Sequence, residues 1–342
     1  MRLRIATAAL LALGATPLAQ AEDSVQFTTR AQYETRGANL ANPYRVRDWE
    51  HAVAAADLRW QWDAPWQTAV KGLVTARAAG DEEGRLTLNE LSFERAAGSG
   101  FVTVGKKIIS WDVGYAFRPL DVVQQEDRRA LNVTNLVGVP LLAYERFTAD
   151  SALTFVWSNP GRGKADQPRG DESLALRWYA SADARDQYAV LRVSQRNGVE
   201  GGVSFSQVHG DGLELHGSIL FQQRHDTWTG THWEQQGSGA KALAGLTWTT
   251  ESKWMMVAEA WADRTALKGQ QHNVLLREEW RDGDLAIGGD VLWQTQSGSR
   301  IVSASVAWTP APWQLSASVR RYGGVAGYVV RSAAVFTVQR AF

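Results

Sequence analysis

The stretch Val25–Glu34, VQFTTRAQYE, splits into two chemically distinct faces when its residues are taken alternately. One set is mostly apolar, running from Val25 through Phe27 and Ala31 to Tyr33, and the other set is entirely polar. Because successive side chains of a β-strand point to opposite faces of the sheet, this period of two predicts a strand that is apolar on one side and polar on the other.

The same alternation recurs along the whole chain and predicts an all-β protein. Most of the predicted strands are about ten residues long, the length of a tilted strand that crosses a membrane. Eighteen segments qualify, near 24–35, 49–62, 66–77, 85–96, 100–110, 139–148, 151–158, 171–180, 187–196, 201–208, 212–225, 239–249, 253–263, 271–281, 284–295, 300–309, 312–322 and 327–342. The segments near 100–110, 139–148 and 201–208 alternate poorly, so sixteen strands is the alternative count.

Short and long connections between these segments also alternate. Short turns such as Asp63-Ala64-Pro65 and Pro310-Ala311 are separated by longer linkers such as 36–48 and 159–170. Short turns on one rim and long loops on the other are expected of outer-membrane barrels. No Pro- or Ser-rich linker divides the chain, so residues 22–342 are expected to form one domain.

The first residues have the three parts of a secretory signal peptide. Two arginines in Met1–Arg4 precede an apolar run from Ile5 to Leu13, and Ala19-Gln20-Ala21 supplies a small-residue cleavage site. The apolar run is shorter than the roughly 20 residues that a membrane helix needs. Residues 1–21 are therefore expected to be removed, which leaves Glu22 as the first mature residue.

The composition excludes several classes of protein. The chain has no cysteine, so it forms no disulfide and carries no lipoprotein anchor. Its 36 basic and 36 acidic residues balance, which argues against a nucleic-acid partner. We expect no cofactor and no metal site.

The 16 tryptophans cluster beside the predicted turns. Trp60, Trp62 and Trp66 flank one turn, Trp248 and Trp254 a second, and Trp308 and Trp313 a third; Trp49, Trp157, Trp261 and Trp293 fall near the opposite strand ends. An indole ring is apolar but has an N–H donor, so it favours the level of the lipid headgroups. This placement predicts two aromatic girdles.

The last segment, Ser332–Phe342 or SAAVFTVQRAF, ends the chain on an aromatic residue. It resembles the C-terminal strand that bacterial outer-membrane proteins present to their assembly machinery. The resemblance implies that Phe342 is the assembly signal and that the barrel-assembly machinery is a partner. Arg340 departs from the apolar residues usual on that face, although near a rim its guanidinium could reach the headgroups.

Together these features predict a single closed antiparallel transmembrane β-barrel in the outer membrane of a Gram-negative bacterium. In lipid every backbone N–H and C=O group must be paired internally, so the sheet must close. Outer-membrane lipids and lipopolysaccharide are then the expected surroundings of the barrel, and its oligomeric state stays open. At about eighteen strands the lumen is wide enough to hold water.

The polar set of alternate residues is expected to line this lumen. It mixes both charges with arginine in excess, which predicts a mild preference for anionic or zwitterionic solutes. The candidate lining residues are Arg30, Glu34, Asp57, Arg59, Lys71, Arg177, Arg192, Glu214, His216, Arg224, Arg277, Asp290, Arg320 and Arg331.

The segment Phe101–Asp121 breaks the pattern. A strand with Gly105 and two lysines runs into Trp111-Asp112 and then Arg118-Pro119-Leu120-Asp121. It resembles the strand-to-loop segment of barrels in the alginate-export-like and related porin families, where a Gly-basic pair precedes Trp-Gly and Pro-x-Asp. Asp112 stands where those barrels have glycine. The resemblance implies a channel for an organic solute or a secreted saccharide.

The linker from Trp111 to Val139 is the longest in the chain, and loops of this length are usually functional or disordered. One hypothesis is that it folds into the lumen and narrows it, with basic and acidic residues in opposed rows. The candidate constriction residues are Arg118, Asp121, Glu126, Asp127, Arg128 and Arg129. The alternative is an external loop whose charges are solvated.

Other functions fit the sequence less well. A barrel enzyme needs a catalytic set, yet none of His51, His209, His216, His225, His232 and His272 lies in a nucleophile or metal-binding motif. His225 and His232, with Asp226 and Glu234, could bind a metal, but a solvated loop is the simpler interpretation. The first strand starts too soon after residue 21 to leave room for the plug of a TonB-gated transporter. An adhesion or structural barrel remains an alternative to the channel.

Overall fold

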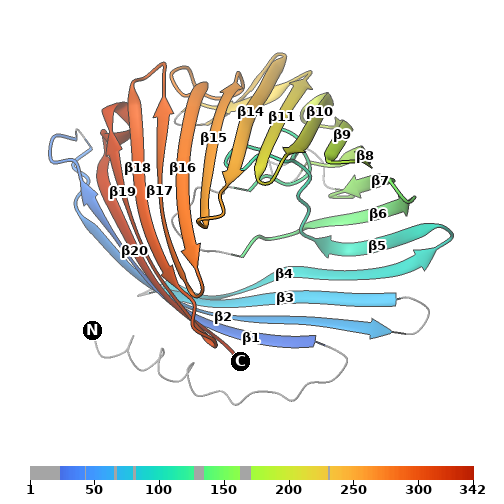
Figure 1. Cartoon of the computed structure of the whole chain (residues 1–342), viewed down its shortest axis with the longest axis horizontal. Coiled ribbons are helices and arrows are strands. Elements are labelled where there is room, and N and C mark those ends of the chain that lie inside the picture. Colours follow the sequence, from blue (N-terminus) through green and yellow to red (C-terminus); the bar gives the residue numbers. More distant parts are fainter. Residues whose placement is uncertain are drawn as a thin grey trace.

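The computed structural model describes residues 24–42, 44–64, 68–79, 82–126, 135–161, 171–229 and 232–342. These residues form a closed barrel of 18 antiparallel strands (Figure 1), which confirms the all-β prediction and the higher of the two strand counts. No helix within the described ranges is long and apolar enough to cross a membrane. The predicted signal peptide 1–21 and the expected mature start at Glu22 lie outside the described residues.

The strands follow one another around the barrel in sequence order. Their bounds are β1 Ser24–Ala38, β2 Trp49–Ala64, β3 Thr68–Ala79, β4 Glu82–Ala97, β5 Gly100–Lys107, β6 Val139–Phe147, β7 Ser151–Ser158, β8 Ser173–Ala182, β9 Arg185–Ser194, β10 Gly198–His209, β11 Leu213–Gln222, β14 Gly239–Thr249, β15 Trp254–Asp263, β16 His272–Asp282, β17 Leu285–Gln294, β18 Ser299–Trp308, β19 Trp313–Gly323 and β20 Val330–Ala341. A hairpin of β12 His225–Trp228 and β13 Trp233–Gln236 projects between β11 and β14, and the short helix η2 Gly324–Gly327 precedes β20.

The barrel closes where its first strand meets its last. β1 pairs with β20 from Thr28 opposite Ala341 to Ala38 opposite Val330, with one register shift at Gly37. The amide of Phe342 extends this ladder by donating to the carbonyl of Phe27 at 2.9 Å. Closure gives the first and last strands hydrogen-bonding neighbours on both sides, as a lipid environment requires.

The side-chain alternation of the sequence separates an outer face from an inner face. In β7, Leu153, Phe155 and Trp157 are exposed on the outside, whereas Thr154 and Val156 are buried on the inside. The same division holds around the barrel, where large apolar side chains dominate the exposed outer surface. An apolar outer surface of this kind matches the lipid-facing band of a membrane barrel.

The two rims differ in the length of their connections. The rim that carries both chain ends is closed by short turns, such as 98–99 and 283–284, where Gly98 and Gly283 take positive φ values of 61° and 52°. Such φ values are easy for glycine and strained for other residues. We call this the turn rim and the other the loop rim; the longest loop-rim connection runs from residue 108 to residue 138.

Most tryptophans lie on the outer face, as predicted, but some do not. The outward-facing ones near the turn rim are Trp60, Trp62, Trp178, Trp248, Trp254, Trp280, Trp308 and Trp313. Trp49 and Trp261, expected in the opposite girdle, lie instead on the inner face, where Trp261 stacks on Phe117 with ring centroids 5.5 Å apart. Trp66 lies outside the described residues.

Candidate functional site

The lumen is the candidate site, and the strand register decides which residues face it. The predicted lining residues on strands have inward-facing register positions, and Arg224 follows β11 at the loop rim. Arg331 lies near the loop-rim end of β20 and is exposed. The part that each residue plays in solute passage stays a prediction.

Several of these charges are engaged within the wall. Arg192 forms ion pairs with Glu200 and with Asp171, the latter at 3.4 Å, and its side chain is only 7% exposed. The guanidinium of Arg177 lies over the ring of Tyr188, 5.0 Å from its centroid. The charge of Arg192 is therefore compensated by two carboxylates, whereas that of Arg177 is held against an aromatic ring.

A second group of charges lies on the wall formed by β19, β20, β1, β2 and β3. Arg30 pairs with Asp57 at 3.4 Å, and Arg320 donates to the hydroxyl of Ser303 at 3.0 Å. Arg59 is exposed on this inner face, with Lys71 on the neighbouring strand. We call Arg30, Arg59, Lys71 and Arg320 the basic wall.

The first part of the connection between β5 and β6, residues 108–126, folds into the barrel, as the first of the two hypotheses for this loop predicted. Its apolar residues Trp111, Leu120 and Val122 pack against inward-facing side chains of β6 to β11, and Leu120 is fully buried. The wall residues in this cluster are Leu141, Val156, Ala175, Val190 and Leu220. We call residues 108–126 the inserted loop, which is visible inside the barrel in Figure 1.

Two buried carboxylates hold the inserted loop in shape. Asp121 Oδ1 accepts hydrogen bonds from the backbone amides of Trp111 at 2.5 Å and Asp112 at 3.0 Å. Asp112 in turn accepts from the amide of Leu120 at 2.6 Å and from the hydroxyl of Ser218 on β11 at 2.6 Å. The Asp112 carboxylate therefore ties the loop both to itself and to the wall.

Burial raises the pKa of Asp121 above its usual value, because a charged carboxylate loses its hydration there. The positive charge of Arg118 and the hydrogen bonds from the two amides oppose that shift without cancelling it. The neutral form of Asp121 is thus favoured more than that of an ordinary aspartate.

The tip of the inserted loop is attached to the far wall through Glu259 on β15. The carboxylate accepts from the amides of Tyr115 at 2.5 Å and Ala116 at 2.9 Å, and it lies 3.0 Å from His216 Nε2 on β11. Gly245 of β14 sits in register between His216 and Glu259, and a Cβ there would overlap both side chains. Glycine at this position lets two side chains from non-adjacent strands meet.

The three constriction residues in the described part of the loop pair with one another, so they do not form the opposed rows that the sequence suggested. Arg118 pairs within the loop, with Asp121 at 3.4 Å and Glu126 at 4.0 Å. Asp121 is only 2% exposed, so it supports the loop from within instead of facing the passage. Asp127, Arg128 and Arg129 lie outside the described residues.

The wall residues that hold the loop, above all Glu259, Ser218 and Gly245, were not predicted from the sequence. A signal for the apolar part of this contact was present. Leucine and valine occupy inward positions on β6 to β11 where a water-filled lumen alone would favour polar residues, as at Leu141 and Val156. A second layer inside the barrel explains these positions.

The loop-rim histidines considered as metal ligands have other partners. His225 Nδ1 lies 2.8 Å from the carbonyl of Gly237, and Asp226 forms an ion pair with Arg196. Within the described part of the chain, no group of three or more His, Asp or Glu residues is placed to hold a metal ion.

Comparison with known proteins identifies the architecture. No protein-family model and no curated protein matches the chain. Among solved structures, OccK11 (OpdR) of Pseudomonas aeruginosa has a TM-score of 0.65 at 7% identity, covering 94% of this chain and 96% of its own. OpdQ of the same organism has a TM-score of 0.65 at 9% identity, covering 94% and 99%. A mutant of the Rh. blastica porin has a TM-score of 0.53 at 12% identity, covering 94% and 100%. The chain therefore has the barrel fold of porins.

Proposed function

We propose that this chain is a passive channel of the Gram-negative outer membrane, through which small organic solutes or a secreted saccharide diffuse. The observation that carries the proposal is a closed 18-strand barrel with an inserted loop attached to its inner wall. A loop that buried hydrogen bonds hold inside the lumen narrows a passage for solutes, and it does not build a catalytic pocket.

The basic wall supports a weak preference for anions or zwitterions. Arg30, on β1, lies across an 18-strand ring from β11, whose inner face contacts the inserted loop. A charge in a narrow, partly dehydrated passage acts more strongly on a passing ion than the same charge in open water. Asp57 beside Arg30 moderates this field, so the expected selectivity is mild.

Two observations bear on the kind of solute, the sequence resemblance at Phe101–Asp121 and the basic wall. Barrels of the alginate-export-like families suggest a saccharide, whereas the basic wall favours small carboxylates or zwitterions. Neither a catalytic role nor an adhesion role has an observation in its favour among the described residues, so the channel is the function that we carry forward.

Reversal potentials across a planar bilayer in a KCl gradient test this function. Wild-type protein should give open, ohmic steps with a small anion preference. Neutralising Arg59 and Lys71 together (Arg59→Gln, Lys71→Gln) should move the reversal potential towards cation preference. Arg300→Gln is the matched control, because Arg300 lies on the outer face against Trp293. Folded protein that shows no conductance would exclude the channel.

A further inference from the structure

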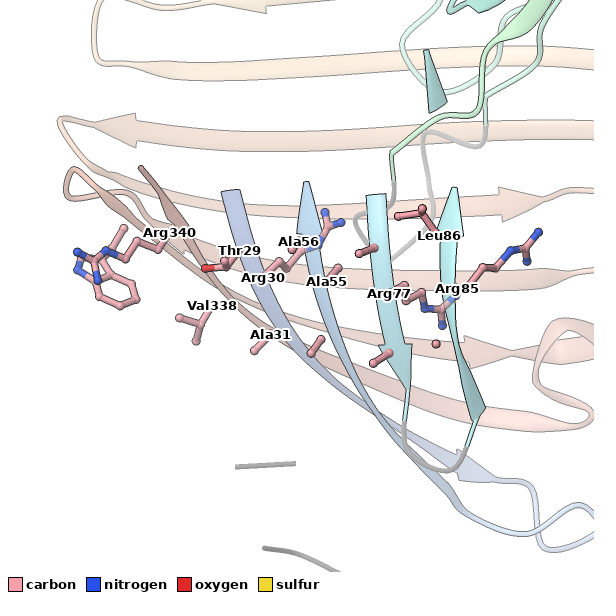
Figure 2. A pocket seen from close by; sticks show the side chains of 15 residues that line it. Thr29, Arg30, Ala31, Ala55, Ala56, Arg77, Arg85, Leu86, Val338 and Arg340 are labelled. Atoms are coloured by element: carbon pink, nitrogen blue, oxygen red, sulfur yellow. The ribbon is translucent and has the colours of Figure 1, made fainter. Parts of the chain in front are cut away.

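The outer wall over β1 to β4 is hollowed because small residues replace the large apolar side chains found elsewhere. A groove of about 420 Å³ crosses these strands, and Figure 2 shows it with Val338 and Arg340 of β20 at one end. Its outward-facing floor consists of small residues: Thr29, Ala31, Ala54, Ala56, Ala76, Ala78 and Gly84. Far from this groove, the outer face of β7 and β8 presents Phe155, Leu176 and Trp178 instead.

The groove runs across the strands from Trp313 on β19 to Leu86 on β4. This path covers five inter-strand spacings, or roughly 24 Å at the usual separation of neighbouring strands. One leaflet of acyl chains is about 15 Å thick, half of the hydrocarbon core. The groove is therefore long enough to hold an extended acyl chain along the barrel wall.

The charge at the turn-rim end of the groove is positive. Arg340 faces outward, opposite Thr29 in the ladder, with its guanidinium carbon 5.1 Å from the Trp313 ring and 4.5 Å from the Phe342 ring. Four arginines line the groove, Arg30, Arg77, Arg85 and Arg340, but the register places the side chains of the first three on the inner face of the barrel. Of these, Arg340 combines an outward-facing position with aromatic neighbours near the turn rim.

We propose that this groove binds one anionic glycerophospholipid of the periplasmic leaflet, with an acyl chain over the alanines and the phosphate at Arg340. A guanidinium donates charge-assisted hydrogen bonds to phosphate oxygens. Basic residues at the level of the headgroups recognise anionic lipids in this way. The proposal needs only that the barrel lies in a membrane, and it concerns the outer wall, not the lumen.

A second copy of the chain fits the same groove less well. Small residues do allow protein backbones to approach closely in lipid. A two-fold contact through this face, however, would bring the outward-facing Arg340 of both copies to one interface, and the groove lining adds no outward-facing acidic residue to it. A lipid phosphate supplies the negative charge that such a contact lacks.

Native mass spectrometry of refolded protein, titrated with phosphatidylglycerol or phosphatidylcholine of identical chains, tests the proposal. Wild-type protein should retain one phosphatidylglycerol more strongly than phosphatidylcholine. Filling the groove with Ala54→Leu and Ala56→Leu should weaken retention of that lipid about tenfold or more. The matched control is Ala242→Leu with Ala244→Leu, which adds the same bulk to the outer face of β14.

Arg340→Gln should abolish the preference for phosphatidylglycerol and leave binding of the acyl chain, whereas Arg300→Gln on the outer face of β18 should change neither. If Arg340→Gln fails to assemble, the variant Ala54→Leu with Ala56→Leu still tests lipid binding in the groove, because both substitutions lie on β2 and not on the last strand. Equal retention by filled and wild-type protein would overturn the proposal. The proposal would also be overturned if wild-type protein formed an oligomer that the variant Ala54→Leu with Ala56→Leu did not form, or if lipopolysaccharide displaced the phospholipid. If wild-type protein did not conduct ions, the proposed channel function would be refuted, but the lipid titration would still test the groove.

Discussion

At the residue scale, Glu259 is the point where the inserted loop depends most on a single side chain. Its carboxylate satisfies two consecutive backbone amides at the loop tip, and the side chain is fully buried. Buried amides that lose their acceptor cost roughly 1–3 kcal/mol each. The position of the loop tip should therefore respond sharply to substitutions here.

Glu259→Ala should free the loop tip and raise the current noise of single channels, because Tyr115 and Ala116 lose their acceptor. Glu259→Gln should have a smaller effect, since its amide oxygen still accepts a hydrogen bond. Gly245→Ala should resemble Glu259→Ala, because a Cβ at 245 forces His216 and Glu259 apart. Bilayer recordings check this order, and a quiet Glu259→Ala channel with unchanged conductance would argue against the attachment.

Asp121 gives a prediction with a defined pH dependence. Asp121→Asn keeps an oxygen for the amides of Trp111 and Asp112 but loses the charge that pairs with Arg118, so it should destabilise the loop less than Asp121→Ala. Burial raises the pKa of Asp121, so the wild-type carboxyl becomes neutral as the pH falls through that raised value. The difference in loop stability between the wild type and Asp121→Asn should therefore become smaller as the pH falls.

Limited proteolysis of the loop across a pH series measures this difference. If the difference in cleavage rate between the wild type and Asp121→Asn became larger as the pH fell, the raised pKa of Asp121 would be contradicted.

At the element scale, the stability of each strand in the membrane depends on which of its alternate residues face lipid. Val319 is outward-facing and 55% exposed, while its neighbour Ser318 points into the lumen. Val319→Arg should cost about 2–4 kcal/mol if this position is near the bilayer midplane, because an arginine there is desolvated. Ser318→Arg should cost far less. Urea titration of refolding into lipid vesicles compares the two, and equal costs would contradict the parity.

The last strand makes a separate prediction. Phe342 packs on Phe27 of β1 with ring centroids 5.6 Å apart, so it supports barrel closure as well as the proposed assembly signal. Deleting Phe342 should lower the heat-modifiable, folded band in outer-membrane fractions, and Phe342→Tyr should restore most of it. Normal folded levels after the deletion would remove this role.

The strands were predictable because each depends on a local period of two, and all the predicted segments correspond to barrel strands. The inserted loop was only half predictable. Its length marked it, but its attachment requires Ser218, Gly245 and Glu259 to meet from separate strands, and a single sequence does not encode that distance. The poor alternation near β6 was the useful irregularity, since Leu141 faces inward to cover the loop.

At the scale of the whole molecule, the inserted loop forms a second layer inside the barrel over the inner faces of β6 to β9 and β11. Loop residues 111–122 pack on these strands and reach β15, and Asn135, later in the same connection, donates to Thr75 on β3 beside the basic wall. The barrel itself is held by its closed hydrogen-bond ladder, so it should stay folded when the loop is shortened.

Single-channel conductance of a variant in which a short Gly-Ser link replaces residues 109–137 tests the central claim most directly. The wild-type barrel and the variant should both fold, and the variant should conduct several-fold more current with weaker ion selectivity. This result follows because the loop occupies the lumen and its removal widens a water-filled passage. A folded variant with unchanged conductance and selectivity would contradict the account.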